Sequence, residues 1–221
     1  MTKQTTPVSS EQETDLFTPF IKGTVAFCKR NKSSIITALV ILVLAAVLGT
    51  AYCSHQQKVT EKSWEAYYNA QVTLLSQGQD AALPALDKVA IDFPGTPAAT
   101  YSILQKGDLL FATENFAQAA DAYKQITDSK SETLRTAATL SEGAALQAAQ
   151  DYTASIELMQ NFITKNPTNF ALPQAYFTLA MSQELSGDTA SALETYKTLV
   201  ENYAKTYFGM VAKEKIKELQ K

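Results

Sequence analysis

The chain has 221 residues, of which 46% are hydrophobic and 19% charged, and a formal net charge of −3. This length suits one domain with accessory segments, and the mild acidity argues against a nucleic-acid binder, which normally carries a basic face. A single histidine and two cysteines exclude zinc fingers, disulfide frameworks and nearly all histidine-dependent catalysis.

The N-terminal tail, residues 1–33, divides into two parts. Residues 1–14 are rich in Thr, Gln, Ser and Glu and lack aromatic side chains, so disorder is expected. From Asp15 to Lys29 apolar residues recur at a loosely helical spacing, which suits an amphipathic helix on the inner membrane surface. Pro19 and Gly23 weaken that pattern, and a non-specific juxtamembrane segment is the alternative.

A transmembrane helix is predicted over residues 34–53, followed by a helical linker at 54–61. The 19 residues from Ile35 to Cys53 carry no charge, and ten of them are Ile, Leu or Val. A helix of that length is roughly 28 Å long, close to the ~30 Å hydrocarbon core of a bilayer. A buried core helix would normally carry a polar face, which this stretch lacks.

The flanking charges predict how this helix is inserted. Four basic residues lie within 15 residues upstream, whereas only Lys58 and Lys62 lie within 15 residues downstream. By the positive-inside rule the N-terminus stays in the cytoplasm and residues 54–221 are exported. The long segment before the apolar run disfavours a cleaved signal peptide, and bulky Tyr52 before Cys53 disfavours a lipoprotein. An uncleaved signal anchor is therefore favoured.

Residues 62–205 contain a repeat with a period of 36 or 37 residues. A small residue marks the same position in each unit: Ala70, Gly107, Gly143 and Ala180. A large side chain follows 16 positions later: Leu86, Tyr123, Met159 and Tyr196. Two antiparallel helices approach closely where they carry small residues, and large side chains fill the groove between units. The repeat therefore predicts about four helical hairpins.

Turn residues separate the two helices of each predicted hairpin. Four residues stand where each can cap the second helix of its hairpin: Asp80, Asn115, Asp151 and Asp188. No Pro or Gly lies between Thr50 and Gln77, so the membrane helix is expected to continue into the first repeat helix. Residues 206–221 are predicted to form a capping helix, with an apolar face on the last unit and a polar face in water.

These repeats resemble the tetratricopeptide repeat family. The resemblance rests on Gly107-x2-Leu110 and Ala119-x3-Tyr123, on Gly143, Leu146, Tyr152 and Pro167, and on Leu179-Ala180 and Gly187-Asp188. It implies an all-α chain, in which one transmembrane helix precedes a tetratricopeptide-like α-solenoid of about four hairpins and a capping helix. The first unit departs most from the family pattern, because it lacks the glycine and Pro84 intrudes into its second helix.

In this family the first helix of each hairpin lines a concave groove that binds protein partners. The matching positions are Trp64, Tyr67, Gln71, Tyr101, Leu104, Asp108, Phe111, Leu140, Phe177, Met181 and Glu184. Some members grip a C-terminal carboxylate with a clamp of Lys, Arg and Asn, but those positions here hold Tyr67, Leu104, Leu140 and Phe177. An apolar, aromatic groove suits a hydrophobic peptide or a partner helix, although the same side chains could instead pack between repeats.

The sequence favours a non-enzymatic role without a cofactor or a metal. It contains no P-loop, no G-x-S-x-G, no H-E-x-x-H and no glycine-rich nucleotide fingerprint. His55, at the predicted membrane exit, is interpreted as an interfacial polar residue. The carboxylates are scattered over positions predicted to face solvent, which argues against an acid–base pair.

The layout as a whole resembles the family of the ancillary subunit of the bacterial SecYEG translocon. That resemblance implies a single-pass inner-membrane protein that relays exported chains to periplasmic chaperones, with translocon subunits, chaperones and exported chains as partners. The alternative is cell-envelope assembly or division, as in TolA-binding coordinators and outer-membrane assembly lipoproteins. Their repeat junctions are similar to Pro94-Gly95-Thr96-Pro97-Ala98.

Overall fold

The computed structural model describes residues 17–126 and 129–221, so the disorder predicted for residues 1–14 lies outside the described residues. Every regular element within those ranges is an α-helix, which confirms the all-α class. The chain divides into two compact units, residues 1–57 and 58–221. The helices are α1 (Phe17–Arg30), α2 (Lys32–Gln77), α3 (Gln79–Asp92), α4 (Pro97–Ala112), α5 (Phe116–Lys124), α6 (Glu132–Ala148), α7 (Tyr152–Lys165), α8 (Leu172–Leu185), α9 (Thr189–Tyr203) and α10 (Tyr207–Leu219).

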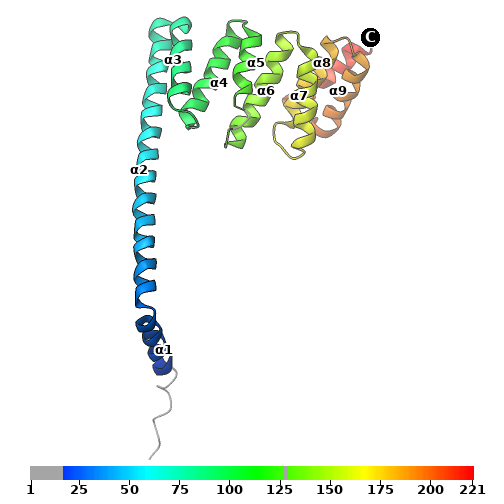
Figure 1. Cartoon of the computed structure of the whole chain (residues 1–221). Helices are drawn as coiled ribbons and strands as arrows, with labels where there is room; N and C mark the ends of the chain where they lie inside the picture. Colours follow the sequence, from blue (N-terminus) through cyan, green and yellow to red (C-terminus); the bar gives the residue numbers. More distant parts are fainter. Residues whose placement is uncertain (1–16, 127–128) are drawn as a thin grey trace, which may run out of the picture. The chain divides into compact units, whose positions relative to one another are not determined.

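The first unit consists of α1 and the N-terminal part of α2. Helix α2 is 46 residues long and runs without interruption past Thr50 to Gln77, as the lack of Pro and Gly predicts (Figure 1). Its most apolar stretch has a mean hydropathy of 2.5, and none of that stretch is buried by the rest of the protein. The helix therefore has the length and composition to cross a membrane. Helix α1 ends with Lys29 and Arg30 in its last turn.

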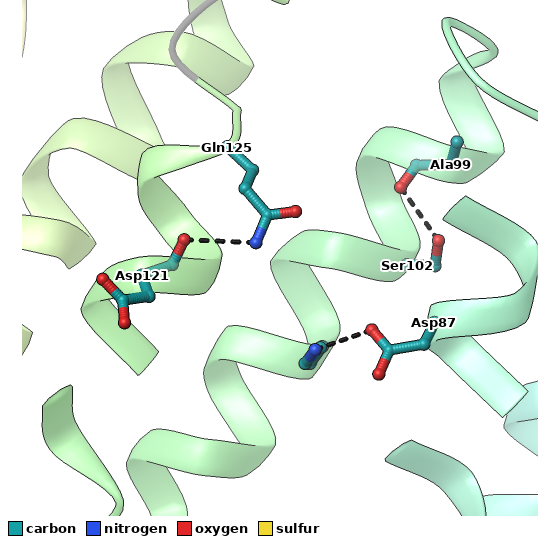
Figure 2. Close-up of polar contacts among 6 residues, drawn as sticks. Asp87, Ala99, Ser102, Asp121 and Gln125 are labelled. Atoms are coloured by element: carbon teal, nitrogen blue, oxygen red, sulfur yellow. Dashed lines mark hydrogen bonds and ion pairs between the residues drawn. The ribbon is translucent and has the colours of Figure 1, made fainter. Parts of the chain in front are cut away.

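The second unit is a stack of antiparallel hairpins. Each hairpin pairs a first helix (α2, α4, α6 or α8) with a second helix (α3, α5, α7 or α9), and α10 packs on the end of the series (Figure 1). Consecutive helices from α3 to α10 pack against each other. Polar bonds also join neighbouring hairpins: Lys106 of α4 donates to Asp87 of α3 over 2.6 Å. Figure 2 shows the dashed line that ends at the carboxylate of Asp87.

The small residues of the first helices lie under the large residues of the second helices. All four small residues and all four large residues of the repeat are buried. A β-carbon built at Gly143 would lie 2.5 Å from Met159 Cε, and one at Gly107 would lie 2.5 Å from Tyr123 Cε1. This contact confirms the predicted register: the second helix can pack this closely only where the first helix lacks a side chain.

Each hairpin turns through one residue with positive φ. These residues are Gly78 (86°), Glu114 (63°), Gln150 (65°) and Gly187 (90°). The left-handed conformation closes the first helix and lets the second begin within one or two residues. Glycine adopts it without strain in two of the turns, whereas Glu114 and Gln150 adopt it at a steric cost.

The predicted caps are partly confirmed. Asp151 and Asp188 each accept a hydrogen bond of 3.1 Å from the backbone N–H three residues on. Asn115 occupies the cap position of α5, but its amide donates to Thr113 Oγ1 instead. The prediction for Asp80 is wrong, because the left-handed turn at Gly78 lets α3 begin at Gln79 and leaves Asp80 inside the first turn.

The C-terminal helix closes the stack. Thr206 caps α10 by accepting a hydrogen bond of 3.1 Å from Gly209 N–H. Ala212 is buried at the end of the core formed with α8 and α9, and Phe208, Ile216 and Leu219 pack against that core. The charged residues of the opposite face are exposed, apart from Lys215, which is half-buried. The predicted polar-backed cap is therefore confirmed.

Candidate protein-binding surface

An aromatic cluster forms at the N-terminal end of the stack, on the first helices of two consecutive hairpins. Trp64 lies with its ring centroid 5.8 Å from that of Tyr67 in an edge-to-face arrangement, and 5.6 Å from that of Tyr101. Trp64 is 39% exposed and Tyr101 is 40% exposed. We call these three residues the aromatic cluster. Partly exposed rings that already support one another provide a rigid, amphipathic surface for a partner.

The environment of Tyr67 keeps its hydroxyl neutral. Burial raises the pKa of Tyr67, its hydrogen bond with Gln71 lowers that pKa, and the nearby Tyr101 and Asp108 raise it further. Gln71 Nε2 in turn donates a hydrogen bond of 3.0 Å to Gln105 Oε1 on α4. Gln71 and Gln105 thus place a pair of uncharged amides beside the cluster, with Asp108 further along α4.

Three of the predicted groove residues on α4 also pack within the hairpin that α4 forms with α5. Asp108 accepts a 2.7 Å hydrogen bond from Tyr123 Oη, although its own side chain is exposed. Phe111 packs edge-on against Phe116, with 5.1 Å between ring centroids. Leu104 packs against the buried core that contains Tyr123. These residues combine surface exposure with a structural role within the hairpin.

The predicted groove residues of the C-terminal hairpins lie deeper in the protein. Leu140 is buried in the core formed by α6, α7 and α8. Phe177 and Met181 pack against the core of α8, α9 and α10. Glu184 accepts a 2.8 Å hydrogen bond from Tyr196 Oη and a 3.0 Å hydrogen bond from Lys215 Nζ. The structure therefore does not gather all eleven predicted positions into one exposed strip.

The tyrosines that face these carboxylates are held in their neutral form. Burial, followed by the hydrogen bond and the charge of Asp108, raises the pKa of Tyr123 well above its ordinary value. Burial and Glu184 act on the pKa of Tyr196 in the same direction. Both phenols therefore remain donors, and each ties a second helix to the first helix of its own hairpin.

A hollow of about 410 Å³ opens between α6, α8 and α10 and was not predicted from the sequence. Its rim carries Phe170, which is 78% exposed, and Tyr207, which is 69% exposed. Phe170 lies in the turn between α7 and α8, and Tyr207 is the first residue of α10, so both lie outside the periodic pattern. For Phe170, a large apolar residue in a turn was the signal available in the sequence.

Glu142 contradicts the prediction that the carboxylates face solvent. Its side chain is only 7% exposed. It stands four residues after Ala138 and four before Leu146, and so on the apolar face of α6. That spacing was the sequence signal for its burial.

Among the residues that the structure describes, no group of three or more His, Cys, Asp or Glu side chains is placed to hold a metal ion. Cys28 and Cys53 are both exposed and free.

Comparisons with known proteins agree with this architecture. A family described as a tetratricopeptide repeat-like domain matches residues 26–153, more than half of the chain, and a tetratricopeptide repeat model matches residues 174–206. The chain belongs to the tetratricopeptide repeat-like family. Tetratricopeptide repeats are protein–protein interaction modules, and this chain is accordingly an interaction scaffold. No curated protein gives a significant match to it.

Solved tetratricopeptide structures share the fold. A Podosopora anserina kinesin light chain with nearly identical TPR-like repeats superposes with a TM-score of 0.54 at 15% identity, covering 72% of this chain and 86% of that one. MamA from Desulfovibrio magneticus RS-1, residue 41 to its end, gives a TM-score of 0.51 at 16% identity, covering 72% and 95%. At these identities the likeness concerns the fold alone.

Proposed function

We propose that this tetratricopeptide repeat-like chain is a membrane-anchored, non-enzymatic scaffold of the Sec translocon, which links protein export to periplasmic chaperones. The observation that carries the proposal is the position of the aromatic cluster. Trp64 and Tyr67 belong to α2, the same helix that contains the candidate membrane span, and Trp64 follows Cys53 by 11 residues. A partner-binding surface on the anchor helix itself suits a protein that receives clients as they leave a membrane channel.

The chemistry of the cluster suits exported chains as clients. A polypeptide emerging from a translocon is unfolded and exposes apolar side chains. The partly exposed rings of Trp64 and Tyr101 can bury such side chains, while the neighbouring amides of Gln71 and Gln105 can bond to an extended backbone. Aromatic contacts tolerate varied sequences, as a general receptor for exported chains requires.

The flanking charges support the proposed orientation. The four basic residues before the span favour a cytoplasmic N-terminus, which would place the hairpin stack in the periplasm of a bacterial inner membrane. A membrane-permeant thiol reagent should label Cys28 in intact cells, and an impermeant one should label it only after permeabilisation. Residue 201, exposed on α9 and replaced by cysteine (Glu201→Cys), should react with the impermeant reagent once the outer membrane alone is opened.

Cell-envelope assembly or division is the second candidate function. Its support is the junction between the first two hairpins, where Thr96 caps α4 by accepting a hydrogen bond from Ala99 N–H and Pro97 fills the first helical position. The sequence of this junction resembles that of envelope-assembly repeat proteins. The same junction also fits any tetratricopeptide stack, so it supports this function less strongly than the aromatic cluster supports the first.

In vivo photo-crosslinking separates the two functions. A photoreactive phenylalanine analogue is placed at Tyr52, at Trp64 and, as a matched control on the distal hairpins, at Glu201. The translocon proposal expects channel subunits to be captured from the first position and exported chains or chaperones from the second. Capture of outer-membrane or cell-wall assembly factors alone would favour the second candidate.

A further inference from the structure

A second hollow lies outside the aromatic cluster, between the second helices α5 and α7, and has a volume of about 380 Å³. Helix α6, between them in sequence, contributes Glu142 and Leu146 to its wall. The polar residues that line it are Asp121, Lys124, Glu142, Asp151, Glu157 and Asn161. Figure 2 shows the carboxylate of Asp121 pointing away from Gln125, whose amide bonds to the backbone carbonyl of Asp121.

The charges that line this hollow are mostly negative. Four carboxylates face one lysine, Lys124, so the lining carries a formal charge of −3 when all are ionised. Asp151 and Glu157, two of these carboxylates, are exposed to solvent. Asp151 uses Oδ1 to cap α7. A cation entering the hollow would therefore meet several acceptors at once.

Glu142 is the residue that points to a ligand rather than to a solvated acidic surface. The residue is more than nine-tenths buried, and none of the residues that the structure describes provides a hydrogen-bond partner for its Oε2. A buried acceptor left without a donor is unfavourable, so such atoms usually have a partner. Burial raises the pKa of Glu142, Lys124 lowers it, and Asp121 raises it. A donor supplied from outside would satisfy this carboxylate.

We propose that this hollow binds an arginine side chain of a partner protein. A guanidinium is planar and carries five N–H donors, so it can bond to several carboxylates at once. The apolar side chains in the wall, among them Leu146 and Leu158, can pack against the methylene stem. Lysine offers a compact, strongly hydrated point charge that fits spread acceptors less well. The proposal rests on the scaffold role of the chain and does not depend on the translocon assignment.

Methyl NMR of the full chain in detergent micelles tests the proposal. The probes are the tripeptide amide Gly-Arg-Gly, its neutral citrulline counterpart and Gly-Lys-Gly. We expect saturable shifts of the Leu146 and Leu158 methyl signals with the arginine peptide, and binding about fivefold or more weaker with the other two. Glu142→Gln should weaken arginine binding to a similar degree. Glu194→Gln, an exposed substitution on α9 with the same change in charge, should leave it unchanged.

Several outcomes would overturn the assignment. They are the absence of saturable shifts, equal binding of the citrulline or lysine peptide, and equal effects of the two glutamine substitutions. If Glu142→Gln fails to fold, the exposed Asp121→Asn provides the same comparison. Trp64→Ala should not affect arginine binding, so failure of the aromatic cluster as a client site would be distinguishable from failure here.

Discussion

The ring of Tyr123 packs on Gly107 of α4, where a β-carbon would lie 2.5 Å from Tyr123 Cε1. The hydroxyl of Tyr123 donates a hydrogen bond to Asp108, the next residue of α4. Both the ring carbons and the hydroxyl of Tyr123 are therefore held against α4. We expect Gly107→Ala to force α4 and α5 apart and to lower the free energy of unfolding by about 1–3 kcal/mol. Chemical denaturation of the full chain in micelles, followed by circular dichroism, measures the change.

Gly143→Ala is the matched comparison. Its β-carbon would lie 2.5 Å from Met159 Cε, the end of a flexible, unbranched side chain that can rotate away. Alanine also favours the helix over glycine by about 1 kcal/mol. Gly143→Ala should therefore change stability by less than Gly107→Ala. Equal losses in the two variants would contradict the different roles assigned to Tyr123 and Met159.

The bond between Tyr196 and Glu184 predicts a loss of stability that does not depend on side-chain volume. Tyr196→Phe keeps the buried ring but removes the 2.8 Å hydrogen bond to Glu184 Oε2. A hydrogen bond to a charged group contributes about 1.5–3 kcal/mol, and we expect a loss near the lower end because Lys215 still pairs with Glu184. Tyr207→Phe, at an exposed tyrosine, should change the unfolding free energy little.

The single tryptophan makes the aromatic cluster directly observable. A synthetic peptide of alternating leucine and alanine, with terminal lysines for solubility, should exclude water from Trp64 and shift its emission to shorter wavelength. Tyr101→Ala should weaken this saturable shift, because the ring centroid of Tyr101 lies 5.6 Å from that of Trp64. An unchanged titration in the Tyr101→Ala variant would contradict a shared binding surface, and a glutamate–serine peptide serves as the negative control.

Glu142 predicts a pH dependence of stability. Because burial raises its pKa in the folded chain, the folded state binds more protons than the unfolded state between the two pKa values, and stability falls as pH rises through that window. Glu142→Gln removes this dependence. The variant should gain stability relative to the original chain as pH rises, by about 1.4 kcal/mol for each unit of pKa difference.

Denaturant unfolding of both proteins at several pH values measures this difference. The other carboxylates cancel in the comparison, since both proteins contain them. A constant difference across the pH range would show that Glu142 titrates as it does in the unfolded chain.

The hairpin architecture could be predicted from the sequence because it depends on local periodicity. The spacing from Gly107 to Tyr123 and from Gly143 to Met159 reflects direct steric contact, so the pattern and the packing carry the same information. Caps formed within one turn, such as Asp151, could be predicted for the same reason. The cap at Asp80 could not, because the conformation of Gly78, two residues earlier, determines where α3 begins.

The surface was harder to predict, because residues at equivalent repeat positions have different neighbours along the stack. Trp64 is at the first hairpin and stays partly exposed, whereas Phe177 packs against α9 and α10. Periodicity identifies the helix face of a residue but not which hairpin covers it. The spacing of Glu142 from Ala138 and Leu146 places it on the apolar face of α6, but the α5 and α7 residues that surround it cannot be read from that one helix.

The ion pair between Lys215 and Glu184 joins the final helix to α8, across 31 positions of sequence. A product that stops before α10 would lose this link and leave Phe177, Met181 and Tyr196 without their cover. Chaperones and proteases recognise exposed apolar surfaces of this kind. Copies that lack α10 should therefore be degraded rather than accumulate and compete with the intact chain for partners. The presence of α10 is thus expected to decide whether the hairpin stack persists in the cell.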